Sequence, residues 1–219
     1  MFEVREIAYL SHVISAIKVA MDTGKLTVVH AWPRPTSLAH LRGFLGLTGY
    51  YRKFVRWYAS IVTPLTDLTK KDAFVWNPEA EKAFELLKIA LTIAPLLRLP
   101  DFSLSFVLEI DASGVGIGTV LMQEGLPMAY FSQKMSNQMQ KQSSYVRELF
   151  AVMQAMAKFL HYLLGHYFLI RTDQHSLKEL FTQSLHTPEQ QQWLPKFLGY
   201  DFEVQYKSDK DNIALDALS

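Results

Sequence analysis

Four acidic residues stand where secondary-structure elements are expected to meet a sheet, and their side chains could bind divalent cations. Asp111 and Asp173 each end a predicted strand, which is where ligands bind in open α/β sheets. Glu148 lies in the first half of a predicted helix, at the edge of its apolar stripe. Asp216 lies on the last predicted helical segment. Taken singly, each acid is better explained as a cap or a solvated residue.

Taken together, the four acids indicate binding of hard metal ions. The chain has no cysteine and no histidine cluster, and Mg²⁺ and Mn²⁺ prefer oxygen ligands. Two such ions about 4 Å apart can activate a water molecule and stabilise the leaving oxygen in phosphodiester hydrolysis. Because two neighbouring dications need comparable negative charge, this chemistry requires three or four carboxylates. The set predicts a metal-dependent hydrolase.

Composition narrows the class of protein. The chain has 219 residues, of which 49% are hydrophobic and 20% are charged, so it is expected to fold into one or two packed domains. It contains no apolar run of about 18 residues, which argues against a membrane span. The charged N-terminus lacks the apolar core of a signal peptide, which predicts an intracellular location.

The net charge of +1 hides an uneven distribution of charge. Residues 1–100 carry 13 basic and 8 acidic side chains, a balance of +5, whereas residues 101–219 carry 9 and 13, a balance of −4. No acidic residue occurs between Asp22 and Asp67. This asymmetry suggests two parts with different partners, although chance clustering on a solvated face explains it equally well.

The rear half alternates strands and helices. Strands are predicted over 105–111, 119–122, 128–132, 167–172 and 202–206, the first three forming an antiparallel meander. A long helix should begin near Ser143 or Ser144 and end before Gly165. Further helical segments are expected from Ser176, Pro188 and Asp211. This order predicts an α/β fold with mixed strand directions.

The front half is expected to be mainly helical after an initial hairpin. Residues 3–14 alternate as strands do. A helix should follow Ser37, with glycines at 43, 46 and 49 interrupting it, and Pro64 should begin another. Asn77 and Pro78 should cap and begin a further helix. Pro95 and Pro100 bracket an expected linker.

Ordered motifs along nearly the whole chain resemble those of gypsy-class LTR retrotransposon reverse transcriptases. Their sequences are most similar to those of plant elements. Four front segments resemble the thumb and connection: Phe44–Phe54, Pro64–Thr66, Phe74–Trp76 and Ala83–Lys88. Four rear segments resemble the ribonuclease H domain: Asp111–Gly118, Arg147–Leu149, Thr172–Gln174 and Asn212–Ser219. The resemblance implies a reverse transcriptase palm-end and thumb-like segment over 1–70, a connection or tether over 71–100 and a ribonuclease H-like domain over 101–219.

The resemblance also implies a fold, an activity and roles for the four acids. The fold would be a mixed five-stranded sheet flanked by helices, and the activity would be cleavage of the RNA strand of an RNA–DNA hybrid with two Mg²⁺ or Mn²⁺ ions. In that family the metal-binding and catalytic acids correspond to Asp111, Glu148, Asp173 and Asp216. Asp111 would bridge both ions, Glu148 and Asp173 would hold one, and Asp216 would hold the other.

The polymerase site of that family is not found in the sequence. Its paired aspartates have no counterpart, because no two aspartates are adjacent anywhere in this chain. We therefore expect no DNA synthesis, and we expect the chain to work with the fingers and palm of a longer polyprotein. The resemblance implies that the intracellular location is the cytoplasm, a virus-like particle or the nucleus. Two alternatives stay open: an inactive nucleic-acid-binding or scaffold remnant, and a nuclease that acts on another substrate.

A basic and aromatic stretch is the predicted nucleic-acid contact. Cations neutralise phosphates, whereas Phe54 and Trp57 are expected to pack inward. The predicted backbone-binding residues are Arg42, Arg52, Lys53 and Arg56.

Overall fold

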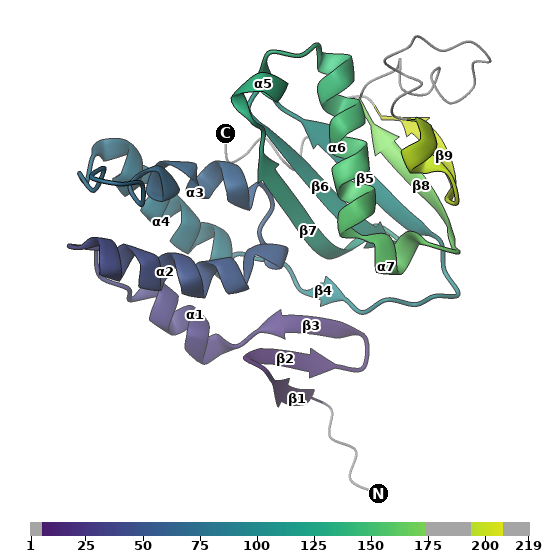
Figure 1. The fold of residues 1–219 in the computed structure, drawn as a ribbon. Coiled ribbons are helices and arrows are strands. Elements are labelled where there is room, and N and C mark those ends of the chain that lie inside the picture. The colour runs from purple at the N-terminus through teal and green to yellow at the C-terminus, as the bar shows by residue number, and fades with distance from the viewer. Residues whose placement is uncertain (1–5, 174–193, 208–219) are drawn as a thin grey trace, which may run out of the picture.

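The computed structural model describes residues 6–173 and 194–207, and the chain begins there with a small antiparallel sheet (Figure 1). Its strands are β1 (Glu6–Tyr9), β2 (His12–Ser15), β3 (Lys18–Met21) and β4 (Leu97–Arg98), in the order β1-β2-β3-β4. The predicted initial hairpin is confirmed as β1 and β2. The segment predicted as a linker contributes β4, which pairs with β3.

Helices follow the first three strands and share a core with them. They are α1 (Thr23–His30), α2 (Leu38–Tyr50), the 3₁₀ turn η1 (Arg52–Phe54), α3 (Tyr58–Asp67) and α4 (Pro78–Thr92). The side chains of Ser37 and Asn77 accept hydrogen bonds from backbone N–H groups in the first turns of α2 and α4, as predicted. Fully buried side chains such as Phe44 and Leu87 fill the space between the helices.

Two local predictions for these helices are wrong. Helix α2 runs without interruption through Gly43, Gly46 and Gly49. Glycine costs a helix about 1 kcal/mol relative to alanine, and burial of one face of α2 offsets that cost. Helix α3 begins at Tyr58 rather than at Pro64, which lies inside it. A proline inside a helix removes one backbone hydrogen bond, so sequence favours its placement at the first turn.

The rear part is a mixed five-stranded sheet in the order β7-β6-β5-β8-β9. Strands β5 (Phe106–Ala112), β6 (Gly116–Gln123) and β7 (Leu126–Lys134) form the predicted antiparallel meander. Strands β8 (Tyr167–Thr172) and β9 (Asp201–Tyr206) add to it in parallel with β5. The predicted α/β class and the mixed sheet are confirmed. The helices expected from Ser176, Pro188 and Asp211 begin outside the described residues.

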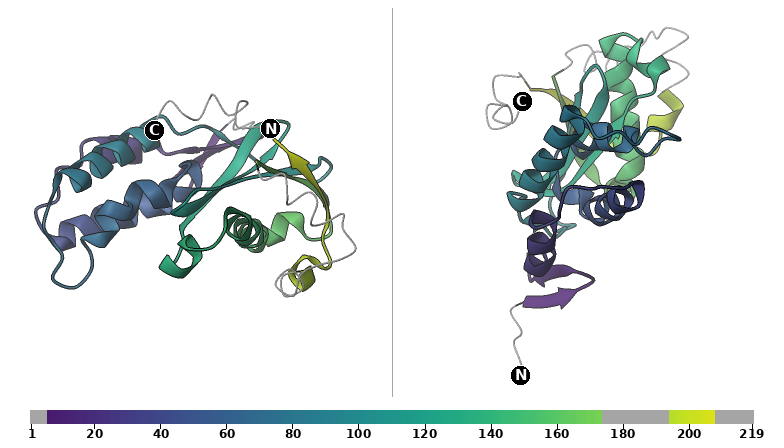
Figure 2. Two further views of the ribbon diagram at one scale, coloured as in Figure 1. Left: turned by 90° about the horizontal axis from the view of Figure 1, so that it is seen from above. Right: turned by 90° about the vertical axis from the view of Figure 1, so that its left-hand side faces the viewer.

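Helices cover one face of this sheet. They are α5 (Asn137–Gln140), α6 (Ser144–Lys158) and α7 (Leu160–Leu163), and a 3₁₀ turn, η2 (Leu194–Phe197), precedes β9. Seen from above, α6 lies against one side of the strands (Figure 2). Phe106, Leu108 and Ile110 of β5 point into this second core, as the period of two in a strand requires. The alternate residues of β5 therefore face the opposite side, which we call the open face.

Candidate carboxylate site at the strand ends

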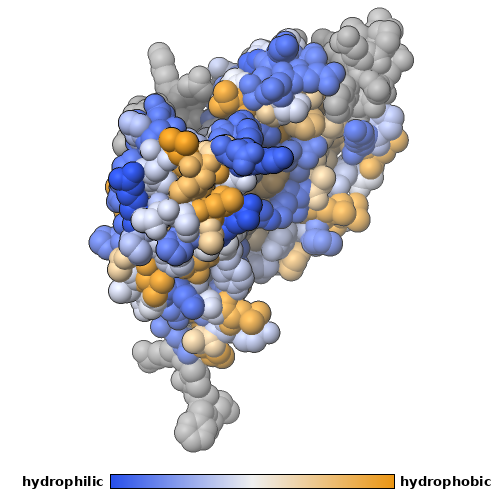
Figure 3. All heavy atoms as spheres, turned by 60° about the vertical axis from the view of Figure 1, so that its left-hand side comes forward, coloured by the Kyte–Doolittle hydropathy of each residue, from blue (hydrophilic) through white to orange (hydrophobic). Residues whose placement is uncertain are grey.

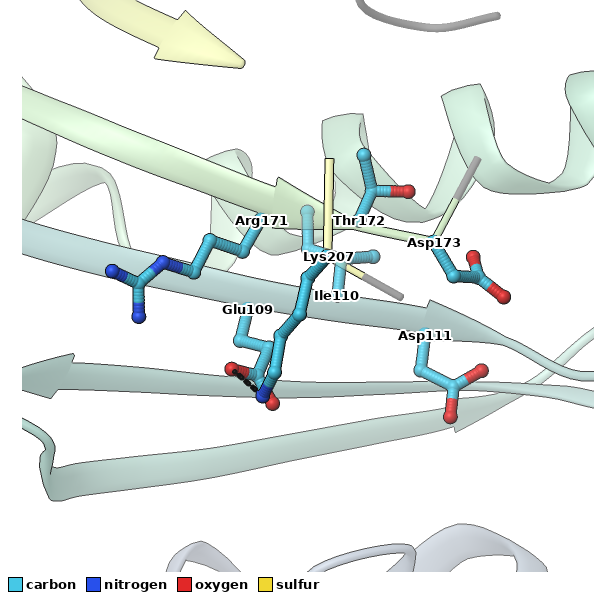
Figure 4. A pocket seen from close by; sticks show the side chains of 7 residues that line it. All are labelled: Glu109, Ile110, Asp111, Arg171, Thr172, Asp173 and Lys207. Carbon is cyan, nitrogen blue, oxygen red and sulfur yellow. Dashed lines mark hydrogen bonds and ion pairs between the residues drawn. The ribbon is translucent and has the colours of Figure 1, made fainter. Parts of the chain in front are cut away.

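Two of the predicted acids lie at the same edge of the sheet. Asp111 is the second-last residue of β5, and Asp173 directly follows β8. Because β5 and β8 are parallel neighbours, their carboxyl ends meet at one edge. Both aspartates line a single shallow pocket, and their carboxylates lie on the same side of it (Figure 4). The structure therefore brings Asp111 and Asp173 together.

Glu148 approaches the same edge from helix α6, and its side chain is buried at 3% exposure. Burial, together with the negative charges of Asp173 and Asp111, raises the pKa of the Glu148 carboxyl to about 7. The Thr172 hydroxyl donates a hydrogen bond of 2.6 Å to this carboxyl and acts in the opposite direction, lowering the pKa. Three predicted acids thus influence one another electrostatically.

The fourth acid, Asp216, lies outside the described residues. Within residues 6–173 and 194–207, no three His, Asp or Glu side chains come close enough together to hold a metal ion. The donor chemistry nevertheless fits Mg²⁺ or Mn²⁺, because the groups at this edge are carboxylates. Among the described residues, no Lys or Arg lowers the pKa of the buried Glu148 carboxyl.

Five further residues of the pocket were not predicted as site residues from the sequence: Glu109, Ile110, Arg171, Thr172 and Lys207. Glu109 is 8% exposed, and its carboxylate accepts a hydrogen bond of 3.0 Å from the Lys207 ammonium. The Lys207 backbone N–H also donates to the Thr172 carbonyl at 2.9 Å. The strand pattern could have indicated two of these residues. Glu109 lies two residues before Asp111 and shares its face, and Thr172 directly precedes Asp173.

The predicted basic contacts differ in their surroundings. Arg42 and Arg52 are exposed, whereas Lys53 is half-buried with its Nζ 5.3 Å from the centre of the Phe54 ring. Burial lowers the pKa of Lys53. Arg56 is half-buried and lies 4.0 Å from Glu109. Figure 3, which brings the side of the front helices forward, shows hydrophilic side chains gathered over that face between separate apolar patches.

The aromatic residues of this stretch are mainly structural. Phe54 is 1% exposed, as predicted for an inward side chain, and Tyr51 is equally buried. Trp57 is half-buried and packs against the second sheet rather than within the front core. The exposed arginines are therefore better placed than the aromatics to meet a polyanion.

A β7-β6-β5-β8-β9 sheet with one helix across a face and carboxylates at the ends of β5 and β8 defines a ribonuclease H-like α/β domain. Residues 76–170 match the family described as the RNase H-like domain found in reverse transcriptase. The chain belongs to this reverse-transcriptase RNase H-like family, and its homologues are retrotransposon Pol polyproteins that include gypsy.

Curated relatives extend over the whole chain. The retrovirus-related Pol polyprotein from transposon 297 of Drosophila melanogaster is 36% identical over 98% of this chain, and that of transposon gypsy is 31% identical over 97%. The aligned parts are 20% and 22% of those polyproteins, so the chain spans about a fifth of their length. An uncharacterized mitochondrial protein of Arabidopsis thaliana is 50% identical over 48% of this chain and 68% of its own.

Solved structures agree on the fold. A foamy viral protease-reverse transcriptase in complex with RNA/DNA hybrid has a TM-score of 0.77 at 20% identity, over 93% of this chain and 29% of the viral one. The same type of enzyme in complex with double-stranded DNA has a TM-score of 0.79 at 20% identity, over 94% of this chain and 45% of the viral one. The fold likeness therefore includes residues 6–98, which we call the front segment, as well as the five-stranded sheet, which we call the second sheet.

Proposed function

We propose that this chain is part of a retrotransposon reverse transcriptase whose ribonuclease H-like domain hydrolyses the RNA strand of RNA–DNA hybrids with two divalent metal ions. The observation that carries the proposal is that Asp111 and Asp173, at the ends of β5 and β8, line one pocket and that their charges raise the pKa of the buried Glu148 of α6. Family membership gives independent support.

The proposed roles follow the family resemblance. Asp111, Glu148, Asp173 and Asp216 would hold the two ions, with Asp111 shared between them, Glu148 and Asp173 on one ion and Asp216 on the other. When bound, the ions would supply an activated water and stabilise the leaving oxygen. The Thr172 hydroxyl holds the Glu148 carboxyl in one orientation through its short hydrogen bond. Since the pKa of Glu148 is about 7, nearby positive charge favours its carboxylate form.

The proposed partner is an RNA–DNA hybrid, and the front segment would contact the phosphates of that hybrid. Arg42 and Arg52 are exposed and Lys53 is half-buried, and Arg56, the fourth predicted contact, lies nearest the second sheet. Replacing Arg52 with alanine should weaken binding of hybrids of any sequence and reduce the salt dependence by about one counterion. A filter-binding or anisotropy titration at several salt concentrations measures both quantities, with Lys71→Ala as the exposed-cation control.

A hybrid-cleavage assay with Mg²⁺ or Mn²⁺ tests the activity. Asp111→Asn should reduce cleavage at least about 100-fold, because changes to mere supporting residues of metal sites already cost about 10–100-fold. Asp201→Asn, at the opposite end of the parallel pair β8–β9, is the matched control and should leave cleavage unchanged. Cleavage by the unaltered chain that does not exceed that of Asp111→Asn sinks the proposal.

An inactive nucleic-acid-binding remnant is the second candidate. It is favoured by the finding that no three His, Asp or Glu side chains of the described residues form a metal-binding group. It predicts hybrid binding without cleavage, with little change in affinity for Asp111→Asn. Comparing hybrid with double-stranded RNA and DNA in the same assay also separates a nuclease of different specificity.

The absence of adjacent aspartates in the sequence motivates a further expectation, that the chain alone does not extend a primer. The remaining fingers and palm would come from the rest of a polyprotein. No helix of the described residues has the length and apolar character needed to cross a membrane. A primer-extension assay on the isolated chain measures the expected lack of synthesis.

A further inference from the structure

The open face of the second sheet is partly covered by the chain that leads from η1 into the first turn of α3. We call residues Arg56–Ser60 the clamp; both η1 and α3 contact β7 (Figure 1). Its second residue, Trp57, has φ 56° and ψ 23°, a left-handed conformation that is uncommon for a bulky side chain. Such backbone strain persists only where the surrounding structure holds it in place.

Gly118 of β6 provides the space that holds Trp57. A Cβ added at Gly118 would lie 2.6 Å from two carbons of the Trp57 ring and 2.7 Å from a third. Real Cβ atoms do not approach so closely, so any larger residue at this position must displace the ring. The flat indole therefore lies directly on the backbone of β6.

The clamp touches the row of the sheet that contains Asp111. In the ladder, Gly118 pairs with Asp111 of β5 on one side and with Ser132 of β7 on the other. The Ala59 N–H donates to the Ser132 hydroxyl at 2.8 Å, while Trp57 covers Gly118. Two of the three residues in the row are thus held by the clamp.

Charge ties the clamp to β5 itself. Arg56 lies 4.0 Å from Glu109, which is two residues before Asp111 on the same face and is also held by Lys207 at 3.0 Å. The side chains of Arg56 and Glu109 are only 22% and 10% exposed. The buried Glu109 carboxylate would be destabilised if it lost one of its two cations, Arg56 or Lys207. The contact with Arg56 therefore favours one position of the clamp relative to β5.

We propose that the clamp is a positioning element for the carboxylate site: the front segment fixes the orientation of the β5–β6 ladder, and with it the Asp111 carboxylate. This inference rests on the proposed nuclease function. It makes Trp57 and Arg56 positioning residues that act through Gly118 and Glu109. The front segment is then a working part of the site as well as a surface for nucleic acid.

Gly118→Ala in the full chain tests the clamp without altering any carboxylate. Gly114→Ala is the matched control, because a Cβ at Gly114 has no atom within 4 Å. We expect Gly118→Ala to lower kcat for hybrid cleavage by about tenfold to a hundredfold, the usual cost of misplacing a catalytic group by about 1 Å. KM should change less than about twofold, since the exposed arginines are untouched.

Amide hydrogen exchange gives a readout that does not depend on activity. Gly118→Ala should increase exchange in β5 and β6, and Gly114→Ala should not. Equal exchange and equal kcat for the two variants would overturn the proposal. If the unaltered chain shows no cleavage, the proposed nuclease fails, whereas the exchange comparison still decides whether the clamp holds β5.

A rescue experiment separates positioning from general damage. Trp57→Ala removes the ring that a new Cβ at Gly118 would strike, so adding Gly118→Ala to it should cause little further change in exchange. Trp57→Phe should retain most of the protection. Additive effects of Trp57→Ala and Gly118→Ala would contradict the contact, and full protection in Trp57→Ala would contradict the clamp.

Discussion

The two cores of the molecule bury different kinds of polar group. In the front core the buried polar residues are neutral, such as Thr48, whose hydroxyl lies 3.1 Å from that of Tyr58. In the part that forms the five-stranded sheet, two glutamates, Glu109 and Glu148, are buried. Burying a carboxylate costs free energy unless a cation compensates it. Glu109 has Lys207, whereas Glu148 is buried near two aspartates whose charges also raise its pKa, a cost that the proposed metal ions would offset.

The largest expected effect tests whether the two cores unfold together. Leu87→Ala in the front core and Leu108→Ala in the second core, both fully buried, should each lower the free energy of unfolding by about 2–5 kcal/mol through lost burial and a residual cavity. Denaturation followed by circular dichroism measures both. The exposed Leu96→Ala and Leu126→Ala are controls. Two separate transitions, each shifted by one variant only, would show that the clamp couples the cores weakly.

The next effect concerns Glu148 and depends on pH. Between pH 4.5 and about 7 the folded chain keeps a proton that the unfolded chain has lost, so the free energy of unfolding falls as pH rises through this window. Glu148→Gln removes this loss. Without metal, the variant should therefore gain up to about 3 kcal/mol relative to the unaltered chain between pH 4 and pH 8.

Thermal unfolding across that pH range measures the difference, with the exposed Glu79→Gln as the surface control. Adding Mg²⁺ at pH 8 should stabilise the unaltered chain and narrow its gap from Glu148→Gln, because ligand that binds only the folded state stabilises it. A gap that is independent of pH would contradict the raised pKa of Glu148.

A smaller effect compares two buried threonines, Thr172 and Thr48. Thr172→Val leaves the Glu148 carboxyl without its 2.6 Å donor and should cost about 1–3 kcal/mol at pH 8. Thr48→Val removes a bond between neutral hydroxyls and should cost less, about 1 kcal/mol. Chemical denaturation at pH 8 measures both, and Thr172→Ser, which keeps the hydroxyl, is the control. Equal losses would remove the contrast between the two cores.

The smallest expected effect is the same in both regions. Asn77 caps α4 and Ser143 caps α6, each accepting a hydrogen bond from a backbone N–H of the first turn. Alanine at either position should cost about 1 kcal/mol. Urea titration of both variants checks the values. A much larger loss for Ser143→Ala would indicate that displacing α6 also disturbs Glu148.

Local signals in the sequence were sufficient for the caps, the meander and the strands β8 and β9, because these depend on neighbouring residues. They could not reveal β4, a two-residue strand that exists only through its pairing with β3. Nor could they place the start of α3, which depends on the left-handed Trp57 and its fit against Gly118. Such features arise from contacts between residues far apart in the chain.

The placement of the acidic residues was predictable to a similar degree, whereas their roles stay predictions. Strand ends and helix position predicted Asp111, Glu148 and Asp173, which the structure places around one edge of the sheet. Glu109 and Lys207 come from different strands and meet only in the fold. Their pairing therefore needs the sheet order, which alternation along one strand does not contain. The assignment of Asp216 stays a prediction.

The pairing of β3 with β4 has a consequence for the order of folding during synthesis. Val19 and Leu97 are partners in the first sheet, so that sheet is incomplete until the chain beyond α4 has emerged from the ribosome. The meander β5–β7 needs only short turns and can form soon after. Completion of the first sheet and formation of the meander are therefore close in time, and substitutions in β4 should delay refolding more than substitutions in the β6–β7 turn.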